Sequence, residues 1–61
     1  MNLKVERAKR NMTQGKLSEV SGVGRITISI IERKGLENTQ THVLRKLANA
    51  LNVPVSAFFE E

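Results

Sequence analysis

Several residue types are missing from this chain, and each absence narrows its chemistry. It contains no cysteine, so it can form neither a disulfide bond nor a thiolate metal site. All six acidic residues are glutamates and His42 is the one histidine, which leaves no residue set for a metal site or a Ser-His-carboxylate triad. We therefore expect no enzymatic activity, no bound metal and no cofactor.

Aromatic residues and long apolar runs are also scarce. The two phenylalanines are the only aromatic residues, so the chain offers no platform for stacking RNA bases, and RNA binding is a weaker hypothesis than DNA binding. No apolar segment approaches the ~20 residues that cross a bilayer, and no hydrophobic signal-peptide core follows the first methionine. We expect a soluble, cytoplasmic protein with no membrane partner.

Length and charge set two further expectations. A chain of 61 residues is small enough that we expect one domain, residues 1–61, supported by helix packing and by a second subunit. The net charge is +4, and residues 1–34 carry eight Lys or Arg against three Glu. A basic half is typical of nucleic-acid binding, although a charged surface that only maintains solubility would have the same composition.

Apolar residues recur at helical spacing along most of the chain, which predicts an all-α protein. Thr13 is suited to cap the second helix, and Gly22 and Gly35 are suited to end the second and third. The expected helices cover residues 3–10, 14–21, 25–34, 39 or 40 to 51, and 54–60. The residues expected to be buried are Leu3, Ala8, Met12, Leu17, Val20, Val23, Ile28, Ile31, Leu44, Leu47, Ala48 and Leu51.

The segment from Gln14 to Glu32 is the most informative part of the chain. It combines two short helices with a tight turn at Gly22. Its apolar residues recur on one side of each helix, as they do where two helices pack together. This is the layout of a helix-turn-helix, whose second helix enters the major groove of DNA.

A larger set of residues, spread over almost the whole chain, shares one pattern. Its members are Arg7, Thr13, Gln14, Leu17, Gly22, Val23, Thr27, Ile28, Ser29, Ile31, Glu32, Arg33, Lys46, Leu47, Ala48, Ala50, Leu51, Asn52, Val53, Phe58 and Phe59. The pattern resembles the phage-repressor and Cro-type helix-turn-helix family, which includes small bacterial regulators of the xenobiotic-response-element type. The resemblance implies a compact five-helix, lambda-repressor-like DNA-binding domain.

The resemblance also implies roles at matching positions. Arg7 and Glu32 would form an ion pair that bridges the first and third helices. The residues implied to face the DNA groove are Arg25, Ile26, Ser29 and Ile30. Gln14, Arg33 and Lys34 are implied to contact the DNA backbone, and the basic Lys16 and Arg10 are further candidates. A solvated surface position is the alternative for each lysine.

The groove-facing residues differ in their chemistry. Arg25 suits a bidentate contact with guanine, or a simpler contact with a phosphate. Ile26 and Ile30 are apolar where the family often has polar or basic residues. They would contact thymine methyl groups, repack the edge of the core or dock onto another protein. Gly24 replaces the Ser or Thr that usually caps the third helix.

These observations predict a sequence-specific, double-stranded DNA-binding transcriptional regulator. We expect a homodimer on a two-fold operator, with the helix over residues 25–34 in the major groove. One phenylalanine would close the core, and the expected dimer interface consists of Pro54, Val55, Phe58 and Phe59; packing within the core alone is the alternative. A protein-interaction module, such as an antitoxin-like protein, is the second hypothesis, motivated by Ile26 and Ile30. No small-molecule ligand is expected.

Overall fold

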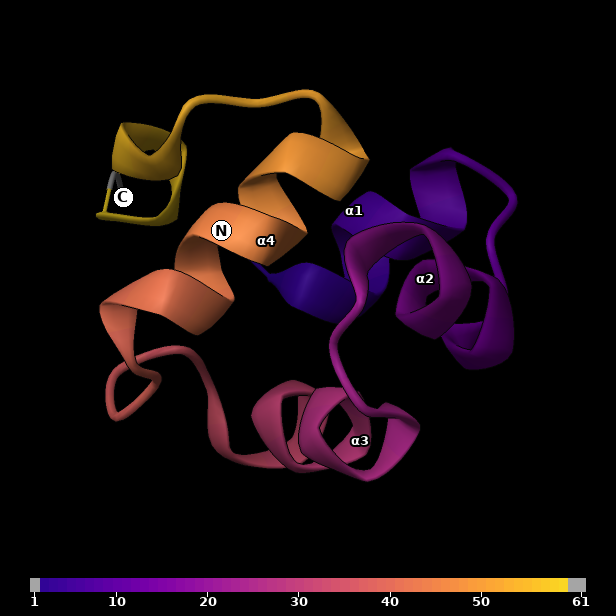
Figure 1. Cartoon of the computed structure of the whole chain (residues 1–61), viewed down its shortest axis with the longest axis horizontal. Coiled ribbons are helices and arrows are strands. Elements are labelled where there is room, and N and C mark those ends of the chain that lie inside the picture. The colour runs from indigo at the N-terminus through magenta and orange to yellow at the C-terminus, as the bar shows by residue number, and fades with distance from the viewer. Residues whose placement is uncertain (1, 60–61) are drawn as a thin grey trace.

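The helices begin and end where the local sequence signals are strongest. The computed structural model describes residues 2–59 and contains no strand within them. Its elements are α1 (Leu3–Lys9), α2 (Gln14–Ser21), α3 (Arg25–Lys34), α4 (Thr41–Leu51) and the 3-10 helix η1 (Val55–Phe59) (Figure 1). The prediction of an all-α protein is confirmed, and the predicted bounds of α2 and α3 agree with the structure.

Specific capping residues explain the bounds of α2 and α3. The Thr13 hydroxyl accepts a hydrogen bond from the backbone N–H of Lys16 at 3.0 Å, which satisfies a free donor in the first turn of α2. Gly22 ends α2 in the left-handed conformation, with φ of 76°, and Gly35 follows α3 with φ of 92°. Gly24 precedes α3 and supplies no side-chain hydrogen bond. The turn between α2 and α3 therefore depends on backbone freedom at Gly22.

The first predicted helix ends one residue earlier than expected, at Lys9, and the last two predicted helices also differ from the structure. α4 begins at Thr41, one or two residues later than expected. The segment expected to form a fifth α-helix forms η1, in which the Ala57 N–H donates to the Pro54 carbonyl three residues earlier. So short a segment gains little from α-helical hydrogen bonds. The prediction of five α-helices is not confirmed, and the expected end at residue 60 lies outside the described residues.

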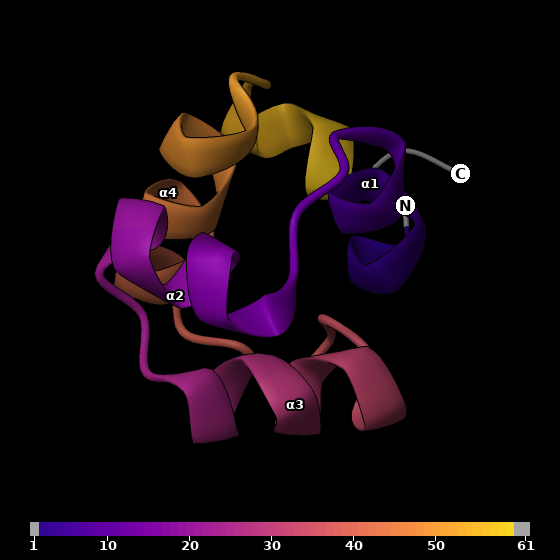
Figure 2. The ribbon, with the colours of Figure 1, turned by 90° about the vertical axis from the view of Figure 1, so that its right-hand side faces the viewer.

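α4 supplies the largest share of the core. Its buried residues lie at i, i+3, i+4 and i+7: Leu44, Leu47, Ala48 and Leu51. They cluster with the other buried residues, which are Leu3, Leu17, Val23, Ile28, Ile31 and Phe58. α2 packs against both α3 and α4. As a result, α3 runs along one edge of the molecule and η1 lies at the opposite edge (Figure 2).

Two residues expected in the core, Ala8 and Val20, are exposed. On α1, Ala8 lies five residues after the buried Leu3, and this spacing puts it on nearly the opposite side of a helix. On α2, burial extends from Leu17 toward Ser21, and Val20 lies on the other flank. Both predictions are wrong because apolar character alone does not fix which flank of a short helix is covered.

Candidate nucleic-acid interface

α3 presents one face to the core and another to solvent. Ile28 and Ile31 are buried on the inner face. Ile26 is 78% exposed and Ile30 is 40% exposed. Successive residues of a helix are rotated by about 100°, so Ile26 and Ile30 project within about 40° of each other. Solvent-exposed apolar surface therefore occupies the centre of the outer face of α3.

Basic side chains flank this apolar centre. By the same helical step, Arg25 lies about 100° to one side of Ile26 and Lys34 lies about 40° beyond Ile30 on the other side, whereas Arg33 projects within about 20° of Ile26, two turns further along the helix. All three are exposed, and none forms an ion pair with the described part of the chain. In the major groove of DNA, base edges lie between two phosphate backbones. An apolar strip with cations on both sides matches that arrangement.

Two hydroxyl groups lie at the borders of the outer face. Ser29 lies on the side of Arg25 and is half-buried, so only part of its side chain is available to the DNA groove. Thr27 is exposed on the side of Lys34 and is a polar residue of this face that was not predicted from the sequence. Its spacing of seven residues from Lys34 is the signal that places it on the same side of the helix.

A polar cluster behind α3 joins three segments of the chain. Arg7 contacts Glu32 through two hydrogen bonds, Nε to Oε2 at 2.8 Å and Nη2 to Oε1 at 3.1 Å. The Arg7 Nη1 also donates to the Met12 carbonyl at 2.7 Å. Gln14 donates from Nε2 to the Glu32 Oε1 at 3.1 Å. The structure thus brings Arg7 and Glu32 together and adds Gln14 and a carbonyl that the sequence did not point to.

Charge and burial make this cluster a rigid support for α3. The Arg7 and Glu32 side chains are 14% and 6% exposed. The hydrogen bond from Arg7 holds the pKa of Glu32 below its ordinary value of 4.5; burial opposes this and Gln14 adds to it. The same bond raises the pKa of Arg7. A bidentate contact between an arginine and a carboxylate fixes the relative orientation of the two groups as well as their distance. The contacts from α1 and α2 therefore hold α3 in one orientation.

Besides Gln14, two more of the residues expected at the DNA backbone are engaged with neighbouring groups. Arg10 donates from Nε to the Leu51 carbonyl at 3.0 Å, and from Nη1 to the Glu6 carbonyl at 2.8 Å and to the Glu6 Oε1 at 3.1 Å. It therefore joins α1 to the end of α4. Lys16 lies 3.8 Å from a carboxylate oxygen of Glu19 in an exposed pair. Such a pair is weak and leaves Lys16 accessible.

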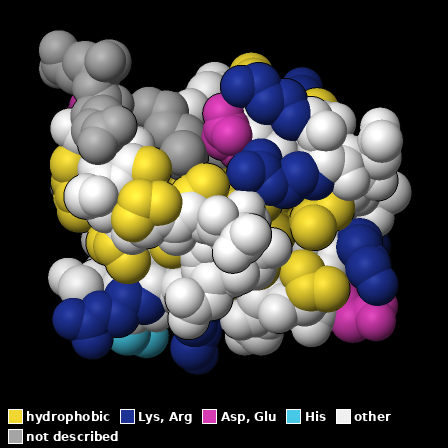
Figure 3. All heavy atoms as spheres, turned by 90° about the horizontal axis from the view of Figure 1, so that it is seen from above, with side chains coloured by type: hydrophobic (Ala, Val, Ile, Leu, Met, Phe, Trp, Pro, Cys, Tyr) yellow, Lys and Arg dark blue, Asp and Glu magenta, His cyan; other side chains and the backbone are white. Residues whose placement is uncertain are grey.

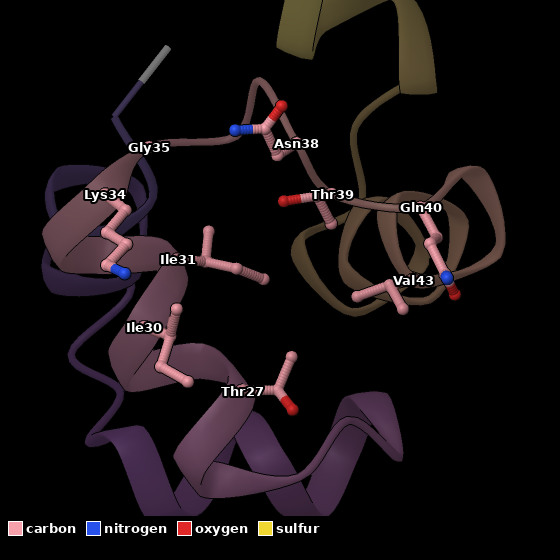
Figure 4. A pocket seen from close by; sticks show the side chains of 9 residues that line it. All are labelled: Thr27, Ile30, Ile31, Lys34, Gly35, Asn38, Thr39, Gln40 and Val43. Atoms are coloured by element: carbon pink, nitrogen blue, oxygen red, sulfur yellow. The ribbon is translucent and has the colours of Figure 1, made fainter.

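A groove of about 410 Å³ opens between α3 and the chain leading into α4 (Figure 4). The side chains of Ile31 and Val43 point toward each other across it, and Thr39 projects into it from the far side. Lys34 carries the one charge among its lining residues. Ile30 lines the groove as well as the outer face, and this explains why it is less exposed than Ile26.

The C-terminal segment divides its two phenylalanines between core and surface. Phe58 is buried, and Phe59 is 70% exposed. Pro54 is also exposed and Val55 is half-buried. Figure 3 views the side opposite α3 and shows one group of hydrophobic side chains on the left, where η1 lies in Figure 1, and a second group on the right. The residue of this pair that closes the core is therefore Phe58, and Phe59 is the one available to a partner.

Other kinds of site have no support in the described part of the chain. Residues 2–59 contain no group of three or more His, Cys, Asp or Glu residues placed to hold a metal ion. No helix among them is long and apolar enough to cross a membrane. The outer face of α3 is the candidate functional site because its isoleucines and its basic side chains are exposed.

The fold and the exposed α3 define a helix-turn-helix domain, and a comparison with protein families agrees. The helix-turn-helix family model matches residues 3–58. The chain therefore belongs to the helix-turn-helix family of the Cro/C1 type, a family of DNA-binding regulator domains. Neither the curated proteins nor the solved structures gave a significant match.

Proposed function

We propose that the protein is a sequence-specific transcriptional regulator that binds a two-fold DNA operator as a homodimer, with α3 in the major groove. The observation that carries this proposal is the outer face of α3, where an apolar centre lies between exposed cations. Family membership supports DNA binding as such. The particular residues and the dimer are our inference from geometry and charge.

Arg25 is the proposed hydrogen-bonding base contact. It lies at the N-terminal end of α3, where a helix of this type approaches the base edges, and a bidentate contact with guanine contributes roughly 1–3 kcal/mol of discrimination. Ile26, Ser29 and Ile30 are the other proposed groove residues. Arg33, Lys34 and Lys16 are proposed phosphate contacts, which set position without reading sequence. Gln14 acts chiefly through Glu32, and Arg10 has no part in the proposed interface.

A homodimer supplies the specificity that one small domain lacks. The molecule measures 25 × 20 × 18 Å, so one copy spans only a few base pairs. Two copies that pair along the side of the molecule where η1 lies in Figure 1, rather than through the edge opposite α3, keep both α3 helices on one side of the dimer and can present them about 34 Å apart, which is one turn of DNA. The proposed seam is formed by Pro54, Val55 and Phe59, and Phe58 supports it from the core.

The test is selection of binding sites from random duplex DNA, followed by titration of the selected site against a scrambled duplex. We expect a palindromic site and a preference of at least 10³-fold. Arg25→Ala should reduce that preference, whereas Arg33→Ala should weaken binding to both duplexes equally. Failure to enrich any site would refute sequence-specific binding. Sedimentation of the protein with its site would refute the dimer if only one copy binds.

A second candidate function is docking of a protein partner on α3, as in an antitoxin-like protein. The groove beside Ile30 favours it, because its floor is apolar and Val43 extends that floor from α4. The substitution Val43→Ser separates the two functions, since Val43 lies off the outer face of α3. Loss of partner binding with unchanged DNA binding would support docking.

A further inference from the structure

Over the first two turns of α3, the outer face presents no hydrogen-bonding group between its two borders; Arg33 projects to the same side as Ile26 but lies two turns further along the helix. Ile26 and Ile30 provide only aliphatic surface there, and the nearest side-chain hydroxyls, of Ser29 and Thr27, lie on the two borders. Base pairs differ in the major groove by their donors and acceptors and by one apolar group, the C5-methyl of thymine. Aliphatic carbon cannot distinguish the donors and acceptors. It can distinguish a methyl group from the water that otherwise covers the base edge.

The exposed fractions of the two side chains indicate which isoleucine contributes more to contact with a base. Ile26 is 78% exposed, so nearly all of its surface is available to be covered by a ligand. Ile30 is 40% exposed and partly covered by the groove wall, so it adds a smaller contact. Burying one methyl-sized group changes affinity roughly fourfold. Two such contacts in each half of a dimer would make methyl groups a major part of recognition.

Thymine is not the only base with a methyl group at this position. Cytosine methylated at C5 carries the same group at the same place in the major groove, although its pairing partner is guanine. Arg25, the proposed base contact, does not oppose this base pair, because guanine offers two acceptors to an arginine. We infer that α3 recognises the pyrimidine C5-methyl group itself, so that 5-methylcytosine is an equivalent ligand to thymine opposite Ile26. This inference rests on the proposed function, with α3 in the major groove.

The test compares four pools of random duplex DNA that differ only in pyrimidine C5 substitution. The pools contain thymine with cytosine, uracil with cytosine, thymine with 5-methylcytosine, and uracil with 5-methylcytosine. We expect the uracil–cytosine pool, which lacks every C5-methyl group, to bind weakest by at least threefold. The pool with uracil and 5-methylcytosine should recover most of that loss. Equal binding of all four pools would overturn the inference.

A selected site refines the same test. At the thymine opposite Ile26, uracil or cytosine should weaken binding three- to fivefold, and 5-methylcytosine should bind within twofold of thymine. Ile26→Ala should abolish these differences, and Ile26→Thr, which keeps the branched shape, is the second variant. Arg33→Ala should leave them unchanged. A specific site at which uracil is neutral at every thymine would overturn methyl recognition and leave the proposed function intact. Pools that differ in binding without enrichment of any site would overturn sequence-specific binding and leave methyl recognition intact.

Discussion

Replacing Glu32 by Gln removes one charge from the polar cluster and keeps its shape. Of the two charge-assisted hydrogen bonds of 2.8 and 3.1 Å, one then becomes a neutral bond to the amide oxygen and the other is replaced by an amide N–H that faces an arginine N–H, while Arg7 keeps the Met12 carbonyl. Breaking a buried pair costs about 3–5 kcal/mol. Arg7 is still 14% exposed, so we expect a smaller loss of about 2–3 kcal/mol in the free energy of unfolding.

This loss is large for so small a domain. A chain of 61 residues has a free energy of unfolding on the order of 3–9 kcal/mol. Because each kcal/mol corresponds to roughly 4–8 °C in a domain of this size, Glu32→Gln should lower Tm by about 10–20 °C. Urea and thermal unfolding followed by circular dichroism measure both quantities. The matched control is Glu19→Gln, which removes an exposed pair and should cost less than about 0.5 kcal/mol.

The pH dependence of unfolding provides a second measurement on the same variant. Glu32 has a lowered pKa in the folded protein, so its contribution is present above its unfolded value of about 4.5 and is lost as the pH falls through the folded pKa. The difference in stability between wild type and Glu32→Gln should therefore shrink below pH 4.5. Glu6, which also has a lowered pKa, is present in both proteins and cancels in this comparison. A loss below about 0.5 kcal/mol at pH 7, or a difference that does not change with pH, would refute this account of α3.

Three further predictions concern the turn, the start of α3 and the surface near η1. Gly22→Ala should destabilise the protein by about 1–2 kcal/mol, because Gly22 has a left-handed backbone conformation. Gly15→Ala should stabilise it by about 0.5 kcal/mol, because Gly15 lies inside α2 and has no close contact. Urea unfolding that ranks the two variants the other way would contradict this prediction. Gly24→Ser should raise the free energy of unfolding by a few tenths of a kcal/mol, since a Cβ there meets nothing closer than 3.8 Å, and an unchanged or lower Tm would show that the new cap does not form. Phe59→Ser should weaken dimerisation in sedimentation experiments without lowering the stability of the monomer; an unchanged dimer would exclude Phe59 from the seam.

The fold was predictable where capping signals and periodicity coincide. Thr13 and Gly22 set the ends of α2, and the spacing of Leu44, Leu47 and Leu51 identifies the buried side of α4. α1 has no comparable apolar stripe, since Leu3 is its one buried residue. For such a helix the sequence does not reveal which side packs, and Ala8 was placed on the wrong side.

The candidate site was predictable in its position and less so in the partners of its long side chains. Periodicity alone places Arg25, Ile26 and Ile30 on the outer face of α3. Arg10 donates a hydrogen bond to the carbonyl of Leu51, which lies 41 residues later in the sequence, and no local pattern encodes such a contact. The hydrogen bond from Gln14 to Glu32 likewise depends on how α2 and α3 pack. Arg10, which follows α1 and looks available for a ligand in the sequence, thus serves to attach that helix to the end of α4.

The exposure of Ile26 has a consequence for how this protein can change over generations. Its side chain contacts so little of the protein that most replacements there should be nearly neutral for folding. Arg25, Arg33 and Lys34 share that freedom, while Ile28 and Glu32 on the same helix do not. Under the proposed function, mutations can therefore explore new operator sequences on one side of α3 while selection for a folded domain acts on the other. Regulators with different targets can arise from this scaffold by exchanging a handful of surface side chains.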